Sequence, residues 1–172
     1  MPDPTLYSLA ERVGARLKAA GLLLACAESC TGGWIAQALT AVAGSSDWFD
    51  RGFVTYSNAA KQEMLDVAPE TLERFGAVSE ETARSMGKGA LARSRAGIAL
   101  AVTGIAGPTG GTPEKPVGMV CFAWARRNGA TESKTLRFSG DREEVRRQSV
   151  IAALEGVLER LDERSSTERG KR

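Results

Sequence analysis

Three short apolar segments place the strongest limit on the fold of this 172-residue chain. Residues 22–27 and 98–102 are continuous apolar runs, and 117–126 is apolar at both its odd and its even positions. A strand that is apolar on both faces must be covered on both faces, because neither side is suited to contact with water. These segments therefore predict central strands of one sheet, with a helical layer on each side.

The remaining segments have the spacing of amphipathic helices or of more exposed strands. Apolar residues recur every three or four positions in 5–20, and again from Asp141 to Leu161. Further helices are expected at 32–42, 58–65, 69–76 and 79–94, and further strands at 52–56 and 131–138. We expect one α/β domain over residues 1–164, a mixed β-sheet covered by helices on both faces, followed by a polar, disordered tail at 165–172.

The absence of histidine limits the chemistry that the chain can perform. Ser-His-Asp and Cys-His mechanisms are excluded, because both take the proton on an imidazole. Histidine is also the commonest transition-metal ligand, and Cys26 and Cys30 alone do not close a zinc site. We expect no metal and no cofactor. The net charge is only +2 with both signs interleaved, so no nucleic-acid partner is expected.

The location is expected to be cytoplasmic. The first residues lack the basic and then apolar layout of a signal peptide, and no apolar run is long enough to cross a bilayer. The three cysteines are odd in number, and a chain of this size is not a small disulfide scaffold. We therefore expect reduced thiols and no membrane partner.

A polar turn after the first apolar strand is the main candidate for chemistry. Ser29 lies in it, at the carboxyl end of the strand and just before a helix that begins at Gly32 and Gly33. The first N–H groups of that helix, around Thr31, would be free to hold the oxyanion of a tetrahedral intermediate. The alternative is that Ser29 or Thr31 only caps the helix.

A nucleophilic serine needs a base other than histidine. Lys61 lies one helical turn after Asn58, and a lysine whose pKa falls on burial can take the proton, although a lone helical lysine is commonly a solvated surface residue. Tyr56 could relay a proton or orient the amine, or be a plain core or rim tyrosine. Cys30 competes as the nucleophile, since a thiol near a helix N-terminus is acidified.

A second candidate segment is the loop 103–111, which contains four glycines. A strand follows it rather than a helix, so it is neither a dinucleotide fingerprint nor a P-loop. A ligand-cradling loop and a plain wide turn both fit. Near the start of the last helix, Arg142, Arg146 and Arg147 could meet a phosphate, or they could be solvated or paired with neighbouring glutamates.

Three motifs resemble the CinA C-terminal domain family in their order along the chain: AESCTGG at 27–33, GFVTYSNAAK at 52–61 and VTGIAGPTGG at 102–111. The resemblance covers about residues 5–162. It implies an α/β fold, no metal, and the stand-alone form that lacks an additional molybdopterin-binding-like domain. It also implies a nicotinamide-nucleotide amidase, which converts nicotinamide mononucleotide and water to nicotinate mononucleotide and ammonia in pyridine-nucleotide recycling.

The resemblance further implies a serine–lysine mechanism with Ser29 as nucleophile, Lys61 as base and Tyr56 beside them. A catalytically silent nucleotide-binding or regulatory module of the same family is the alternative, and a DNA-binding role has little support in a near-neutral chain. The partner expected is a small pyridine nucleotide, and the chain is expected to form a homo-oligomer. The substrate-binding residues implied are Thr31, Gly32, Gly33, Ser46, Thr103, Gly104, Gly107 and Arg142.

Overall fold

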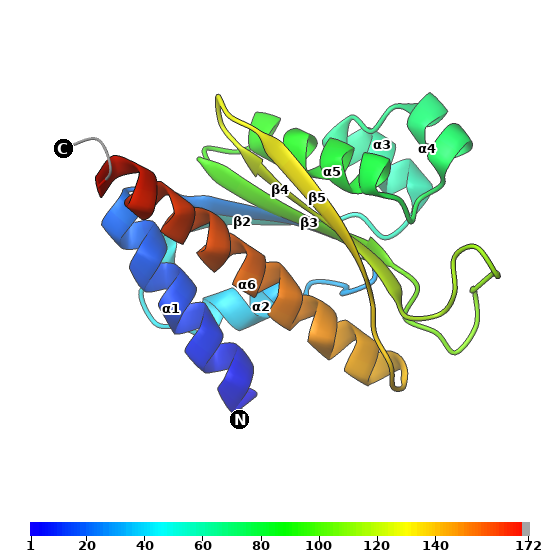
Figure 1. The fold of residues 1–172 in the computed structure, drawn as a ribbon, viewed down its shortest axis with the longest axis horizontal. Coiled ribbons are helices and arrows are strands. Elements are labelled where there is room, and N and C mark those ends of the chain that lie inside the picture. Colours follow the sequence, from blue (N-terminus) through cyan, green and yellow to red (C-terminus); the bar gives the residue numbers. More distant parts are fainter. Residues whose placement is uncertain (170–172) are drawn as a thin grey trace.

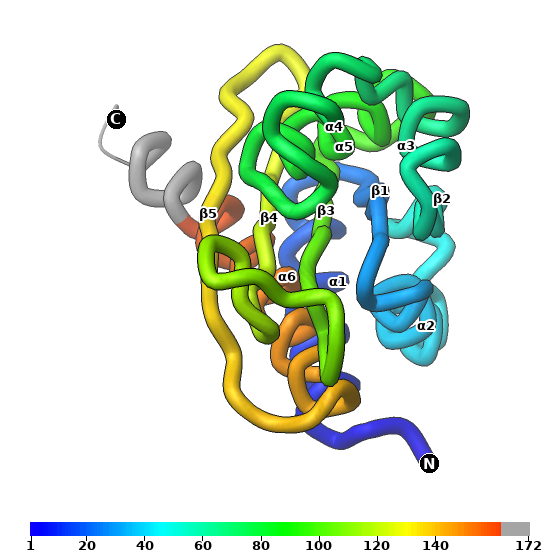
Figure 2. Tube along the Cα trace, turned by 90° about the vertical axis from the view of Figure 1, so that its right-hand side faces the viewer, coloured from blue at the N-terminus to red at the C-terminus, as the bar shows by residue number. Residues whose placement is uncertain are grey.

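Five strands lie side by side in the order β2-β1-β3-β4-β5 in the computed structural model, which describes residues 1–169 (Figure 2). Strand β1 is parallel to both of its neighbours, whereas β4 is antiparallel to β3 and to β5. The predicted mixed sheet is confirmed. The strands are β1 (Leu24–Glu28), β2 (Phe49–Val54), β3 (Ile98–Gly104), β4 (Met119–Arg126) and β5 (Thr131–Arg137).

Helices cover both faces of this sheet, as predicted (Figure 1). Helices α1, α2 and α6 lie on one face, and α3, α4 and α5 lie on the other. No helix within residues 1–169 combines the length and apolar character that crossing a membrane requires. The helices are α1 (Pro4–Ala20), α2 (Trp34–Thr40), η1 (a 3₁₀ turn, Ser45–Asp47), α3 (Asn58–Leu65), α4 (Pro69–Phe75), α5 (Glu80–Ala92) and α6 (Arg142–Arg169).

Two boundaries differ from the sequence-based expectation. Strand β2 begins at Phe49 rather than near residue 52, because it is an edge strand whose exposed positions tolerate polar residues that hide its apolar pattern. Helix α6 continues to Arg169, into the segment expected to be a tail, and the sequence has no glycine or proline between Leu161 and Gly170. The rest of that segment, 170–172, lies outside the described residues.

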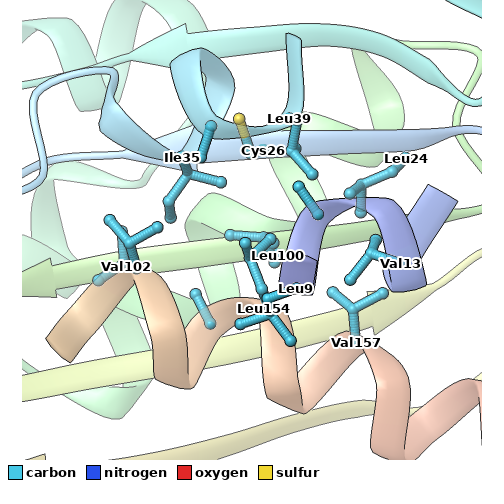
Figure 3. Close-up of a cluster of buried hydrophobic side chains, with 14 of the residues drawn as sticks. Leu9, Val13, Leu24, Cys26, Ile35, Leu39, Leu100, Val102, Leu154 and Val157 are labelled. Atoms are coloured by element: carbon cyan, nitrogen blue, oxygen red, sulfur yellow. The ribbon is translucent and has the colours of Figure 1, made fainter. Parts of the chain in front are cut away.

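The two faces of the sheet carry side chains of different size. Large side chains of β1, β3 and β4 point toward α1, α2 and α6, where they form the main core (Figure 3). The opposite face is almost entirely alanine and cysteine, so that the helical layer over it can lie close to the sheet. The residues of this small-residue face are Ala25, Ala27, Ala99, Ala101, Cys121, Ala123 and Ala125.

Two glycines of α5 allow this close approach in different ways. A Cβ built at Gly87 would lie 3.5 Å from the Cβ of Ala125, which is ordinary contact with the sheet. A Cβ at Gly89 would lie 2.1 Å from the carbonyl oxygen of Leu65 in α3, a distance that no structure accommodates without movement. Gly89 therefore lets α5 and α3 touch, and α3 is the helix that carries Lys61.

This difference predicts opposite effects of one methyl group on the same helix. We expect Gly89→Ala to lower the free energy of unfolding by about 1–3 kcal/mol, because α3 must move away. Gly87→Ala should leave it unchanged or raise it by up to about 1 kcal/mol, because alanine favours a helix over glycine. Urea unfolding of both variants measures this, and equal losses would contradict the assigned contacts.

Candidate active site

Ser29 lies at the carboxyl edge of the sheet, directly after β1, as predicted. Its backbone N–H donates to the carbonyl oxygen of Val102 at 3.0 Å, which extends the pairing of β1 with β3 by one residue. The residue is 7% exposed, so its hydroxyl is almost enclosed but still reaches a cavity. Ligand sites in open sheets of this type lie at the carboxyl ends of parallel strands.

Lys61 reaches the same point from the first turns of α3. The hydroxyl of Ser57 caps this helix by accepting the N–H of Ala60 at 3.0 Å, which fixes where the helix begins. The side chain of Lys61 is 1% exposed, and its Nζ lies 2.9 Å from Ser29 Oγ. Burial lowers the pKa of the Lys61 amine, since water no longer stabilises its charged form.

Two backbone carbonyls determine how the Lys61 amine is oriented. Nζ lies 2.9 Å from the carbonyl oxygen of Thr55 and 3.2 Å from that of Tyr56. A neutral amine has two N–H donors and one lone pair, so these two acceptors take both hydrogens. The charged amine donates to Ser29 Oγ as well, whereas in the neutral form its lone pair would be left for the Ser29 hydroxyl, which would then be the donor. This is the arrangement that proton transfer from serine to lysine requires.

Glu28 is a buried carboxylate beside the nucleophile, to which the sequence analysis assigned no role. It is 0% exposed and accepts hydrogen bonds from the Thr31 hydroxyl at 2.7 Å and from the N–H groups of Ile35 at 2.8 Å and Ala36 at 3.1 Å. Helix α2 begins after Gly33, which has no side chain with which to cap it. The sequence feature that could have indicated this role is an acidic residue shortly before a helix that begins at a glycine.

Arg146 of α6 is a second residue whose role the sequence did not reveal. Its guanidinium donates to the carbonyl oxygens of Cys30 and Thr31, each at 3.1 Å, and lies over the ring of Trp34. Arg146 thus binds the backbone of the turn. The sequence had instead suggested a contact with phosphate or an ion pair at the surface. One sequence feature could have indicated this role at the turn. Arg142 lies four residues before Arg146, so the two side chains share one face of the helix.

Some of the amides at the start of α2 already have acceptors, and of the three residues expected to offer an oxyanion site only Gly32 is among them. Those of Ile35 and Ala36 donate to Glu28, and the N–H of Gly32 donates to the carbonyl oxygen of Ser29 at 3.0 Å. The hydroxyl of Thr31 is likewise used by Glu28. A buried acid has taken the donors, because a helix end inside the protein must have its N–H groups satisfied.

A cavity of about 400 Å³ opens in front of Ser29 and Lys61. The structure brings seven of the predicted site residues to it, and it does not bring Thr31, Gly32, Gly33 or Ser46 there. Among its described residues, the lining contains two basic side chains, Lys61 and Arg142, and no carboxylate. The lining residues are Ser29, Cys30, Tyr56, Lys61, Ala77, Val78, Thr103, Gly104, Ile105, Ala106, Gly107, Thr109, Gly110 and Arg142.

Tyr56 and Arg142 meet at the mouth of this cavity. The guanidinium of Arg142 donates to the carbonyl oxygen of Gly107 at 2.7 Å and to the Tyr56 hydroxyl at 3.3 Å. Tyr56 is 63% exposed, and it is its backbone carbonyl that accepts from Lys61. Of the two roles considered for Tyr56, orientation of the amine involves its backbone carbonyl, whereas its hydroxyl contacts Arg142.

Three other predicted residues have different surroundings from those expected. Thr103 is buried, and its hydroxyl donates to the carbonyl oxygen of Ala77 at 2.8 Å. Burial raises the pKa of Cys30 to about 12, so it is a protonated thiol rather than an acidified nucleophile. Ser46 is exposed in η1, beside the amino end of β1, whereas Ser29 follows its carboxyl end.

Comparison with known proteins agrees with the motifs. A protein-family model described as the CinA C-terminal domain matches residues 6–161. The chain belongs to this family.

Relatives within the CinA C-terminal domain family are similar over nearly their whole length. The nicotinamide-nucleotide amidohydrolase PncC of Escherichia coli (strain K12) is 53% identical, over 94% of this chain and 98% of that protein. The protein of the same name from Enterobacter agglomerans is 52% identical, over 92% and 96%. The crystal structure of competence/damage inducible protein CihA from Agrobacterium tumefaciens is 51% identical, with a TM-score of 0.90, over 94% of this chain and 98% of that one.

The buried amine of this family member predicts a dependence of stability on pH. Burial lowers the pKa of Lys61 below its ordinary value of 10.5, so in the interval between the two values the unfolded chain binds more protons than the folded one. Stability then rises with pH through that interval, by about 1.4 kcal/mol for each unit by which the pKa is lowered.

The variant Lys61→Met lacks this proton and isolates its contribution. We expect the free energy of unfolding of the unmodified protein, minus that of Lys61→Met, to rise from neutral pH to about 10.5. Urea unfolding in reducing buffer across this range measures the difference, in which the titration of the cysteines cancels. A difference that stays constant with pH would mean that the amine titrates as it does in the unfolded chain.

Proposed function

We propose that this chain is an amidohydrolase that converts nicotinamide mononucleotide and water to nicotinate mononucleotide and ammonia. The observation that carries the proposal is the 2.9 Å contact between Lys61 Nζ and Ser29 Oγ, with the other hydrogens of the amine held by two carbonyls. The substrate is suggested by the relatives named nicotinamide-nucleotide amidohydrolase. A serine and a neutral lysine are chemically sufficient for hydrolysis of an amide.

In the first half of the reaction, Ser29 Oγ attacks the carboxamide carbon as its proton passes to Lys61. The resulting ammonium returns that proton to the amide nitrogen, the C–N bond breaks and ammonia leaves. The acyl group remains as an ester on Ser29. In the second half, water attacks the ester while Lys61 takes its proton. The ester bond then breaks, Ser29 regains a proton and the carboxylic acid is released.

The loop after β3 offers groups for the charges of the substrate. No acceptor in the described part of the chain takes the N–H groups of Ala106 and Gly107, and both residues line the cavity. Such amides can hold an oxyanion or phosphate oxygens. Arg142 of α6 contacts the same loop and, with Lys61 neutral, is the one permanent cation among the described residues of the lining. A monoanionic or dianionic phosphate fits this lining, which has no carboxylate.

We also propose the cytoplasm as the location, because Cys26, Cys30 and Cys121 are all free and buried. The partner is a small pyridine nucleotide rather than a nucleic acid, and the protein acts as a homo-oligomer. Light scattering should give a mass above the 18.2 kDa of one chain, and a titration with duplex DNA at low salt should show no binding. A monomeric mass, or salt-sensitive DNA binding, would overturn the respective point.

Release of ammonia from nicotinamide mononucleotide tests the function. We expect Ser29→Ala to lower kcat by about 10³-fold or more, because no other group can carry the acyl intermediate. Cys30→Ala should retain most of the activity, since the neighbouring thiol stays protonated, and it serves as the control for the rival nucleophile.

Two results would contradict this assignment. If Cys30→Ala loses turnover and Ser29→Ala keeps it, the nucleophile is the thiol. If calorimetry shows that the unmodified protein binds the mononucleotide and yet no ammonia appears, the chain is a silent nucleotide-binding module.

A further inference from the structure

The turn that carries Ser29 is held by opposite charges on its two sides. On one side the carboxylate of Glu28 accepts from the Thr31 hydroxyl and from two amides of α2. On the other side the guanidinium of Arg146 donates to the carbonyl oxygens of Cys30 and Thr31. The donors of the turn thus meet an anion and its acceptors meet a cation, and bonds of this kind are about twice as strong as neutral ones.

The turn has little freedom to move between these two groups. Gly32 has a φ of +60°, and a Cβ there would lie 3.4 Å from Nη2 of Arg146, so a larger residue would press against the guanidinium. The ring of Trp34 lies 5.5 Å from the guanidinium carbon on the next turn of the chain. Arg146 is therefore fixed by two adjacent backbone carbonyls and one ring rather than by one partner.

Glu28 also connects the nucleophile to the base. Its carbonyl oxygen accepts the N–H of Thr55 at 2.8 Å, and the carbonyl oxygen of Thr55 accepts from Lys61 at 2.9 Å. Ser29 is the next residue along the chain. A displacement of Glu28 therefore changes the position of Ser29 directly and the position of the Lys61 amine through one peptide unit.

We propose that Glu28 and Arg146 are positioning residues that set the distance between Ser29 Oγ and Lys61 Nζ. Neither lines the cavity, so neither touches the substrate. A buried carboxylate is costly, and Gly33 at the N-cap of α2 has a φ of +100°, so a neutral capping side chain at that position would be strained. An anion at the residue before Ser29 instead pins the turn and the helix together. This role rests on the serine–lysine function proposed above.

Glu28→Gln is the sharpest variant, because it keeps the shape of the side chain and replaces one carboxylate oxygen by an NH₂ group. That group is not an acceptor, so one of the contacts to Ile35 or Ala36 is lost. We expect kcat to fall by about 10–100-fold with KM nearly unchanged, as misplacement of a reacting group does. Loss of folding is monitored by circular dichroism, and Arg146 supplies a second variant if it occurs.

Arg146→Ala should show the same fall in kcat and should recover part of it when guanidinium ion is added at millimolar concentration. Methylammonium should restore less, because it lacks the planar fork that reaches two carbonyls. The matched control is Arg147→Ala on the same helix. Arg147 pairs with Asp3 at 2.6 Å and does not contact the turn, so this variant should keep both kinetic constants.

Two further measurements separate this inference from the proposed function. Amide hydrogen exchange of residues 29–36 should accelerate in Glu28→Gln and Arg146→Ala and not in Arg147→Ala. The rate at which a sulfonyl fluoride labels Ser29, read by intact mass, should fall in the same two variants, whatever the natural substrate is.

The outcomes are distinct. Unchanged exchange in both variants overturns the structural part of the inference, even if the unmodified protein is an active amidase. Accelerated exchange with unchanged labelling and kcat shows a structural role only and overturns the positioning role. If the unmodified protein neither labels at Ser29 nor releases ammonia, the proposed function fails, and the positioning role fails with it.

Discussion

Two backbone hydrogen bonds beyond the end of β1 hold the candidate site together. The N–H of Ser29 donates to Val102 on one side, and the carbonyl oxygen of Glu28 accepts from Thr55 on the other. Because β1 is parallel to both of its neighbours, strands β2, β1 and β3 all end at the same edge of the sheet. The carbonyls that orient the amine and the glycine-rich loop therefore each begin one strand spacing from Ser29, on opposite sides of it.

Two ionisable side chains are buried at the same edge, although burial of such groups lowers stability. The side chain of Glu28 accepts three hydrogen bonds, so its burial is compensated by donors. Lys61 has acceptors, but its burial disfavours the ammonium form, and the pKa of the amine falls as a result. Glu28 thus joins the turn to α2, whereas Lys61 is an amine whose environment is unfavourable to charge.

Local sequence patterns predicted the layers and the two residues that meet at the candidate site. The apolar segments identified β1, β3 and β4, and the motifs identified Ser29 and Lys61. Contacts that join distant segments were not predictable. Arg146 contacts a turn more than a hundred residues away, and nothing in the neighbourhood of Tyr56 shows that its carbonyl, rather than its hydroxyl, faces the amine.

The small-residue face of the sheet has a consequence for how this protein can tolerate change. Helix α5 rests on methyl groups and touches α3 through Gly89, so that one contact has no room for an added methyl group. An enlargement at Gly89, far from any substrate, would be transmitted as a tilt of the helix that carries the amine. Attempts to make the protein more robust are therefore better directed away from this contact, for example at the core under α1, a helix that contributes no residue to the cavity.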